Sequence, residues 1–248
     1  MDALEKRLRD ELLRDLNVKL LETARWSVPV QVMDIEYETV KRTKMDILMK
    51  MLLVAFRTSQ FTSVKELSDM LIVEPLFIQD VIDRMDRAGM IAKSGGAYSL
   101  TQTGRQQLES GIYIQPPEKD ESTVHYSPTH GRFLTVEPKD GGAGEAYRLA
   151  KEFRKLKEFT DDEWREALDL LDVTYQAGDV QLVVHAITSV KELERQSFPC
   201  IEFRLHQTAD GRLYARVWNT LTGEWDETLE NQIMENELTE WREKYLAE

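Results

Sequence analysis

Apart from its many carboxylates, the chain offers few side chains suited to acid–base or metal chemistry: it has four histidines and one cysteine. His125 and His130 lie close together in HYSPTH, a spacing at which two imidazoles of one loop can hold a metal ion. No cysteine lies beside them to complete a metal site, and Cys200 has no histidine at a spacing that marks a catalytic pair. The sequence therefore predicts no metal centre and no cofactor.

The established catalytic motifs are missing as well. The chain contains no GxxxxGK[ST] phosphate loop, no GxSxG nucleophile elbow and no HExxH zinc helix. The small residues of DGGAGEAYRLAKEF, residues 140–153, precede a predicted helix, but no clear strand leads into them and no lysine stands where a phosphate needs one. We expect a non-enzymatic protein; the alternative is an enzyme with an unrecognised site in residues 145–248.

Charge is unevenly distributed along the 248 residues, whose net charge is −13. Residues 1–118 carry 16 basic and 18 acidic side chains, and residues 119–248 carry the other 16 basic and 27 acidic ones. Phosphate contacts need a positive surface, and an acidic half repels nucleic acid at long range. The distribution therefore favours a protein partner over DNA.

Features of membrane and secreted proteins are lacking. No apolar run approaches the length of a membrane-spanning helix, and the N-terminal MDALEKRLRDELLRDL has no signal-peptide core. A single cysteine excludes an intramolecular disulfide. We expect a cytoplasmic protein with no membrane partner.

The N-terminal segment has a leucine at every fourth position from Leu4 to Leu20. This periodicity predicts a helix over residues 2–24. We expect its apolar stripe to pack on its own domain; a homodimer or another partner contact through this helix is the alternative. The alternating run VPVQVMDIEYETV, residues 28–40, then predicts a strand.

Residues 44–113 have clear helix start and stop signals. Periodicity and capping residues predict three helices, a two-stranded hairpin and a closing helix, at residues 44–56, 63–71, 75–88, 90–93 with 97–101, and 103–111. This order, with MDRAGMI and the residues Tyr98, Leu100, Thr101 and Gly104, resembles the winged helix-turn-helix superfamily of the MarR-like or ArsR-like kind. The resemblance implies a fold most often used to grip DNA and also common in protein-binding subunits of larger complexes.

The third of these helices departs from the DNA-reading members of that superfamily. Their recognition helices typically begin with small polar residues, whereas this one begins Glu-Pro-Leu-Phe. Ile78, Ile82 and Met85 share one helical face and should pack inward. The residues left facing outward form the predicted protein-binding site: Leu76, Phe77, Asp80 and Asp83. Cover of the two apolar residues by the same chain is the alternative.

A DNA-binding regulator is the second hypothesis for the function. Its contacts to phosphates or the groove would come from the polar and basic side chains of this region: Lys65, Gln79, Arg84, Arg87 and Lys93. The outward carboxylates oppose it, because they would lie against phosphate charge.

Residues 114–144 are rich in Pro, Gly and charge and are expected to be a linker. Beyond them, the pattern predicts an acidic domain over residues 145–248. Its expected elements are helices at 145–158 and 161–176, a strand at 180–187, a short helix from Ser189, a hairpin of 201–208 with 212–219, and a helix at 227–246.

The predicted fold class is therefore α+β. Residues 1–43 supply a helix and a strand, 44–113 an N-terminal winged helix-turn-helix domain, and 145–248 an acidic α+β domain with a small antiparallel sheet. The function predicted from these features is assembly or regulation of a larger complex through protein–protein contacts.

Overall fold

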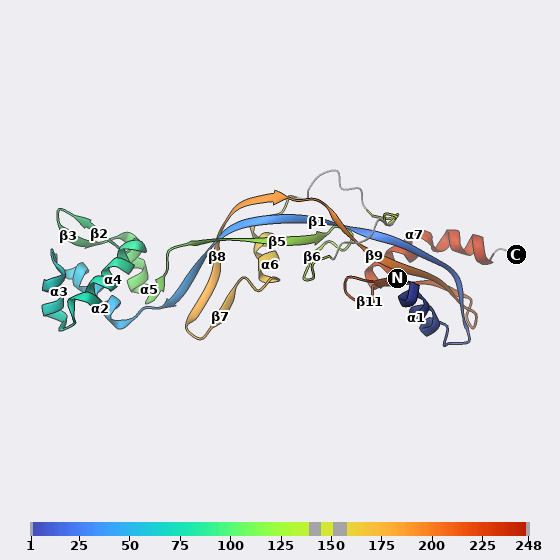
Figure 1. Cartoon of the computed structure of the whole chain (residues 1–248), viewed down its shortest axis with the longest axis horizontal. Helices are drawn as coiled ribbons and strands as arrows, with labels where there is room; N and C mark the ends of the chain where they lie inside the picture. Colours follow the sequence, from blue (N-terminus) through green and yellow to red (C-terminus); the bar gives the residue numbers. More distant parts are fainter. Residues whose placement is uncertain (1, 139–144, 151–157, 247–248) are drawn as a thin grey trace. The chain divides into compact units, whose positions relative to one another are not determined.

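The computed structural model describes residues 2–138, 145–150 and 158–246 (Figure 1). The helices are α1 (Asp2–Leu12), α2 (Ile47–Thr58), α3 (Val64–Leu71), α4 (Pro75–Arg87), α5 (Gln102–Ser110), α6 (Asp161–Asp169) and α7 (Glu227–Leu246). The strands are β1 (Val18–Lys44), β2 (Ile91–Ser94), β3 (Ala97–Leu100), β4 (Ile112–Ile114), β5 (Glu118–Ser127), β6 (Arg132–Leu134), β7 (Tyr175–Ala177), β8 (Val180–Glu192), β9 (Gln196–Gln207), β10 (Arg212–Asn219) and β11 (Glu224–Trp225).

Two compact units share the chain, and each combines segments far apart in the sequence. Unit 1 consists of Met1–Asp34, Thr123–Phe159 and Val190–Glu248. Unit 2 consists of Ile35–Ser122 and Thr160–Ser189. The strands β1, β5 and β8 each contribute residues to both units.

Strands dominate the structure. Nine of them join in one sheet, whose main path has the order β11-β10-β9-β1-β5-β6, while β4 and β8 also pair with β1 and β7 pairs with β8. β1 alone has 27 residues. The predicted fold class, an N-terminal winged helix-turn-helix domain joined to a domain with a small sheet, is therefore wrong. The strand expected at residues 28–40 is only part of β1, whose length depends on pairing with β9, far along the chain, and a local pattern does not show such pairing.

The predicted N-terminal helix is half right. α1 ends at Leu12, and β1 begins at Val18 after a turn in which the Asp15 carboxylate accepts a hydrogen bond from the backbone N–H of Asn17 at 2.9 Å. Leu20 lies opposite Leu205 of β9 in the antiparallel ladder. The four-residue leucine spacing continues into β1, but the ladder with β9 determines the conformation there.

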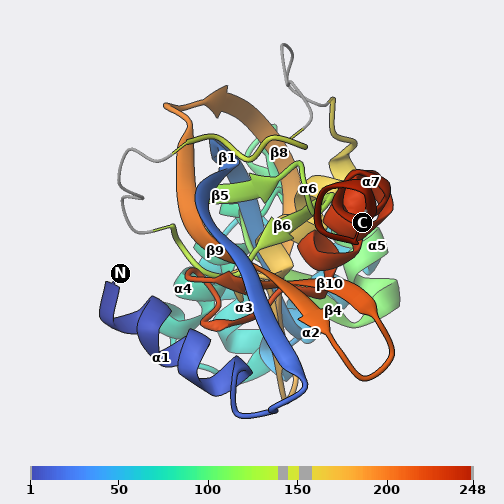
Figure 2. The same cartoon turned by 90° about the vertical axis from the view of Figure 1, so that its right-hand side faces the viewer.

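Unit 1 packs helices on both faces of its sheet (Figure 2). Because side chains alternate along a strand, β9 presents Ile201, Phe203 and Leu205 to one face and Phe198 and Cys200 to the other. The first face receives α1, and the second receives α7. The side chains that α1 buries there are Leu4, Leu8 and Leu12. The expectation that this stripe packs on its own domain therefore holds for the leucines of α1, whereas Leu16, which follows the helix, is 96% exposed.

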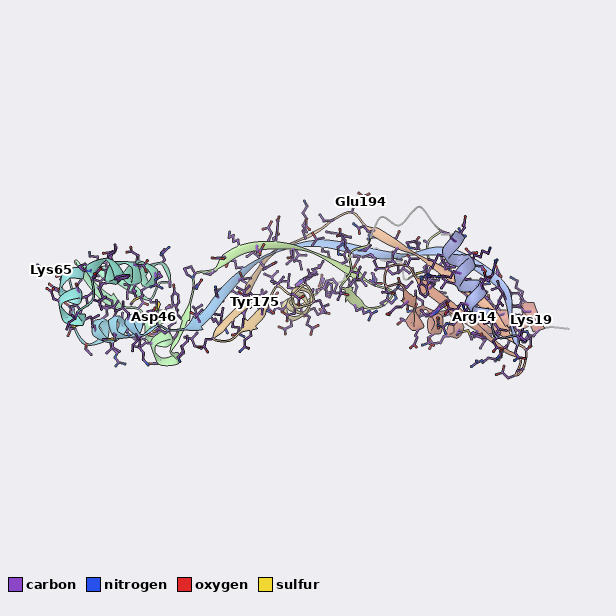
Figure 3. The ribbon with its side chains drawn as sticks, turned by 60° about the horizontal axis from the view of Figure 1, so that its bottom comes forward. Arg14, Lys19, Asp46, Lys65, Tyr175 and Glu194 are labelled. Carbon is purple, nitrogen blue, oxygen red and sulfur yellow. The ribbon has the colours of Figure 1, made fainter. Side chains whose placement is uncertain are left out.

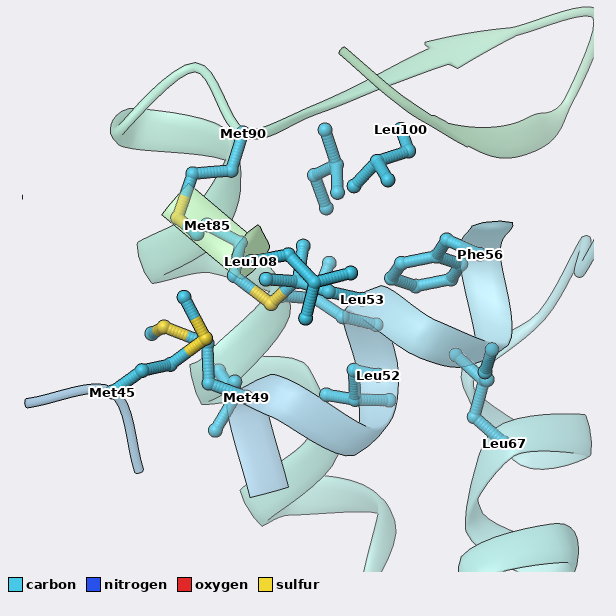
Figure 4. Packing of buried hydrophobic residues seen from close by; sticks show 14 of the residues in the cluster. Met45, Met49, Leu52, Leu53, Phe56, Leu67, Met85, Met90, Leu100 and Leu108 are labelled. Atoms are coloured by element: carbon cyan, nitrogen blue, oxygen red, sulfur yellow. The ribbon is translucent and has the colours of Figure 1, made fainter. Parts of the chain in front are cut away.

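Unit 2 contains α2 to α5 with the β2–β3 hairpin, in the predicted element order, around one apolar core (Figure 4). Local signals define the helix ends. The Asp46 carboxylate accepts from the backbone N–H of Met49 at 2.7 Å and starts α2, and the Thr101 hydroxyl accepts from that of Gly104 at 3.0 Å and starts α5. Gly89 follows α4 with a φ of +63°, as a terminating glycine should.

Several predictions between residues 114 and 192 are wrong. Part of the expected linker forms β5, and the helix expected at 161–176 ends at Asp169, as α6. Gly178, with a φ of +58°, lies in the turn between β7 and β8 instead of ending a helix. Ser189 lies within β8, so it caps no helix. Half of the helix expected at 145–158 falls outside the described residues, and 145–150 are not helical.

The last elements follow the prediction closely. β9 and β10 form the expected hairpin, and α7 covers the expected range. Among the helices in the described part of the chain, none has the length and apolar character needed to cross a membrane.

Candidate functional site

Exposed apolar side chains gather on the helices of unit 2. Seven of the sixteen large hydrophobic residues that are exposed among the described residues lie between positions 47 and 77: Ile47, Met51, Val54, Met70, Ile72, Leu76 and Phe77. Single exposed hydrophobic residues are ordinary, but four of these seven, Ile47, Met51, Val54 and Met70, line one hollow, and a contiguous apolar patch marks an interaction surface.

The helix α2 is apolar on two sides. One side places Met49, Leu52 and Leu53 in the core shown in Figure 4. Ile47, Met51 and Val54, spaced by four and three residues, form a second stripe on the solvent side. A helix that is apolar nearly all round is normally buried, so this second stripe lacks a cover in the described structure.

A groove runs between α2 and α3. Its walls are Ile47, Met51, Val54 and Ala55 of α2 with Met70 and Leu71 of α3, and Lys50 is the one charged residue that lines it. Asp46 and Lys65, labelled in Figure 3, lie at the N-terminal ends of these two helices. The groove has a volume of about 420 Å³, which is within the range of ligand-binding clefts. We call it the α2–α3 groove.

Ile72, directly after α3, combines backbone strain with nearly complete exposure. Its φ of 55° and ψ of 42° lie in the left-handed region, and 92% of its surface is exposed. For a β-branched residue this conformation is unfavourable by about 1–2 kcal/mol. Its side chain stabilises nothing in the described interior, and strain kept at an exposed apolar residue is typical of functional sites.

The predicted partner-binding residues at the start of α4 lie close to Ile72 in the chain. Leu76 and Phe77 are exposed, which excludes cover by the described part of the chain. Asp80 and Asp83 also face outward, but each is engaged within α4: Asp80 pairs with Arg84 at 3.1 Å, and Asp83 accepts from the Gln79 side chain at 2.6 Å.

Most of the residues predicted to contact DNA also make contacts within the chain. Arg87 donates to the backbone carbonyl of Asp83 at 3.2 Å, and Lys93 lies over the Tyr98 ring at 5.0 Å. Lys65 is exposed. Among the residues named for DNA contact, only Arg84 is in an ion pair with a described residue, and a salt bridge on a surface is weak, so the positive charge that DNA would meet here is reduced but not abolished.

Sequence reasoning missed the α2–α3 groove, although a signal existed. Ile47, Met51 and Val54 form a stripe at helical spacing that can be read from the sequence. Met70 and Ile72 carry no comparable signal, because their exposure depends on the packing of α3.

Unit 1 contains a Ser–His–Asp chain with the residue types of a catalytic triad, but its two imidazole nitrogens are interchanged, since in a triad Nε2 faces the serine and Nδ1 the carboxylate. Ser127 Oγ lies 2.6 Å from His130 Nδ1, and His130 Nε2 lies 3.0 Å from Asp226 Oδ2. Ser127 has no exposed surface, however, and a nucleophile must reach its substrate. Asp226 also accepts from the backbone N–H of Leu229 at 3.1 Å, at the start of α7. The arrangement joins α7 to the turn after β5 and is structural.

Hydrogen bonding keeps this buried carboxylate ionised. Burial raises the pKa of Asp226, but the hydrogen bonds from His130 and Asn219 outweigh it and hold the pKa below its ordinary value. His125, the other histidine of HYSPTH, is buried separately, and burial lowers its pKa. No group of three or more His, Cys, Asp or Glu side chains within the described ranges is placed to hold a metal ion.

A cleft of about 560 Å³ in unit 1 is lined by charged side chains of α7 and its surroundings. Its cations already have partners: Arg148 pairs with Glu202 at 2.7 Å, Arg204 with the same carboxylate at 2.8 Å, and Lys244 with Glu22 at 3.0 Å. These closed pairs leave no unpaired cation there to recruit an anionic ligand, so the α2–α3 groove is the stronger candidate.

No family model, curated protein or solved structure matches this chain. The resemblance to the winged helix-turn-helix superfamily is therefore a wrong prediction. A nine-stranded sheet dominates the chain, and no family model supports the assignment. The element order at 44–113 reflects local helix and hairpin signals, which many unrelated folds share.

Proposed function

We propose that this protein is a non-enzymatic binding protein that acts in the assembly or regulation of a larger complex by holding a helix of a partner protein in the α2–α3 groove. The observation that carries the proposal is the uncovered apolar stripe of Ile47, Met51 and Val54 facing Met70 across that groove. A cytoplasmic location belongs to the same proposal.

The apolar chemistry of the groove and the spacing of its lining residues suit a helix. Partner helices that lie in grooves use apolar residues at positions i, i+3 or i+4, and i+7, and the α2 stripe has the matching periodicity. Methionine side chains adapt to different shapes, and Met51 and Met70 lie on opposite walls. Each large apolar side chain that becomes fully buried contributes about 1.5–3 kcal/mol, so three or four of them suffice for a specific complex before ordering costs.

Three further exposed apolar residues follow the groove-lining residues in the sequence: Ile72, Leu76 and Phe77. They support the same proposal, since an exposed strained isoleucine gains a role if a partner covers it. Enzymatic function has no comparable support, because the Ser127 hydroxyl is buried.

Selection from a displayed library of random 16-residue peptides, with the 248-residue chain as bait, tests this proposal. Bound peptides are recovered from the wild type after counter-selection on Met51→Asp. We expect peptides with apolar residues at helical spacing, and hydrogen exchange of the complex should slow in α2 and α3.

The matched control is Leu170→Asp, because Leu170 is exposed to 47% and Met51 to 44%, and Leu170 lies in unit 2 outside the groove. Leu170→Asp should retain the selected peptides, whereas Met51→Asp should bind them at least tenfold more weakly. A selection that returns no Met51-dependent peptide contradicts the proposal.

A further inference from the structure

A second hollow in unit 2 adjoins the α2–α3 groove at Lys50, which lines both. It has a volume of about 470 Å³. Its walls come from the end of β1, the segment between α5 and β4, and the β7–β8 turn: Arg42, Thr43, Lys44, Met45, Ser110, Gly111, Ile112, Gln176, Gly178, Asp179, Val180 and Gln181. We call it the cationic hollow.

Three exposed cations meet at this hollow: Arg42, Lys44 and Lys50. None of them makes an ion pair with a described residue. The chain has 45 acidic and 32 basic side chains, so partners for a cation are in excess, yet these three are left open. Asp179 is the one carboxylate among the lining residues, which leaves the hollow with a net positive charge.

The position of Lys50 connects this charge to the apolar groove. It follows Ile47 by three residues and precedes Met51 on α2, and it lines both cavities. A ligand that fills the groove and continues past Lys50 meets apolar walls first and cations next.

We propose that the cationic hollow binds carboxylates of the same partner helix, so that the partner is an acidic amphipathic segment with an apolar stripe and a cluster of Asp or Glu at one end. This inference rests on the proposed function of the groove. Charge complementarity of this kind sets the orientation of the helix and speeds its association.

Two other occupants fit the surface less well. A second copy of the chain in a two-fold contact would bring the cationic hollow against itself or close to itself, since such interfaces use the same patch on both subunits. Duplex DNA could satisfy the cations, but the apolar walls of the groove offer nothing to phosphate.

The test compares the peptides selected on the wild type with charge-neutral versions in which each Asp and Glu is replaced by Asn and Gln. The binding variant is Arg42→Glu/Lys44→Glu. The control is Arg57→Glu/Lys65→Glu, which changes one exposed arginine and one exposed lysine that line neither cavity. Thermal melting verifies that both variants fold.

We expect the selected peptides to be acidic and to bind the Arg42→Glu/Lys44→Glu variant about tenfold more weakly at low salt, with the control within about twofold of the wild type. The difference should vanish near 1 M salt, where charges on a surface are screened within about 3 Å. The neutral peptides should bind all three proteins alike.

The outcomes separate the two proposals. Peptides that need Met51 but carry no acidic bias, or bind the double-reversal variant normally, overturn the inference and leave the groove proposal standing. Absence of any Met51-dependent peptide overturns both. Displacement of the peptides by duplex DNA, with loss of DNA binding in Arg42→Glu/Lys44→Glu, reassigns the hollow to nucleic acid and overturns the inference.

Discussion

The indole N–H of Trp26 donates a hydrogen bond of 2.7 Å to Oε2 of Glu202, a carboxylate with no exposed surface. Arg148 donates to both oxygens of the same carboxylate, at 2.7 and 3.0 Å, and Arg204 donates to Oε1 at 2.8 Å. One side chain of β9 thus connects β1, the segment at 145–150 and α7, because Arg148 also pairs with Glu237. Burial raises the pKa of Glu202, but the two guanidinium groups outweigh it and hold the pKa below its ordinary value.

Replacing Glu202 with Gln should therefore lower the free energy of unfolding by about 3–5 kcal/mol, since it leaves two guanidinium groups without their shared partner. Urea denaturation measures the change. The control Glu235→Gln removes an exposed carboxylate and should change stability by less than about 0.5 kcal/mol.

The lowered pKa of Glu202 should also make the stability of the fold depend on pH in the acid range. A group whose pKa is lower in the folded state contributes stability above its unfolded pKa and loses it as pH falls below that value. Stability of the wild type should thus decline below about pH 4.5, and Glu202→Gln should show a shallower decline. Equal slopes for the two proteins would count against this account.

Gly104 is predicted to tolerate no side chain. A Cβ at this position would lie 2.1 Å from the carbonyl oxygen of Met90, which already accepts a hydrogen bond of 3.0 Å from the Thr101 backbone. Gly104→Ala should destabilise unit 2 by about 3 kcal/mol, at the upper end of overpacking effects, because a backbone carbonyl held in this way cannot move aside.

Gly111→Ala provides the comparison. Gly111 has a φ of +70° with open space around its Cα, so alanine there meets only conformational strain of about 1–2 kcal/mol. Differential scanning calorimetry of both variants should rank Gly104→Ala as the less stable one; the reverse order would mean that the close approach is relieved by a backbone shift.

His125 should make unit 1 sensitive to mild acid. Burial lowers its pKa, which the carboxylate of Glu137 only partly offsets, so the folded protein takes up its proton at lower pH than the unfolded chain does. Stability should therefore fall as pH drops below about 6.5. Its Nε2 has no hydrogen-bond partner among the described residues, which makes an apolar replacement tolerable.

The variant His125→Leu should remove most of this dependence between pH 6.5 and 5, as followed by thermal melting across the range. His185→Gln, which replaces an exposed histidine, should leave the dependence unchanged. If His125→Leu melts with the same pH profile as the wild type, another group is responsible.

Replacing Ile72 should change folding stability and partner binding in opposite directions. Asparagine adopts the left-handed conformation more readily, so Ile72→Asn should raise the free energy of unfolding by about 1 kcal/mol. The same change removes an exposed apolar side chain of the proposed docking surface and should weaken binding of the groove-selected peptides. A variant that is more stable and binds unchanged would exclude Ile72 from that surface.

The serine of the Ser127–His130–Asp226 chain should not react as a nucleophile in the folded protein. Because the Ser127 hydroxyl is buried, a fluorophosphonate probe should not label the native protein. Ser127→Ala should instead lower the melting temperature, since His130 loses a hydrogen-bond partner in the interior. Labelling of the wild type that disappears in Ser127→Ala would revive the enzymatic hypothesis.

Much of the local structure could be predicted from the sequence because its signals lie within a few residues of one another. The caps at Asp46 and Thr101, the termination of α4 before Gly89 and the hairpin of β9 with β10 depend on neighbouring residues. The range of α7 also matches the helix expected at 227–246, which buries Leu229, Ile233 and Trp241. The sequence by itself determined these elements.

Only the tertiary structure decided the rest. β1 pairs Val18 with Gln207 and Val30 with Gln196, so its length and conformation depend on residues far along the chain, which a local pattern cannot specify. The exposure of the groove residues likewise depends on tertiary packing. Ile47 and Met51 are of the same types as the core residues beside them on α2, and what distinguishes them is that the fold covers one side of the helix and leaves the other open.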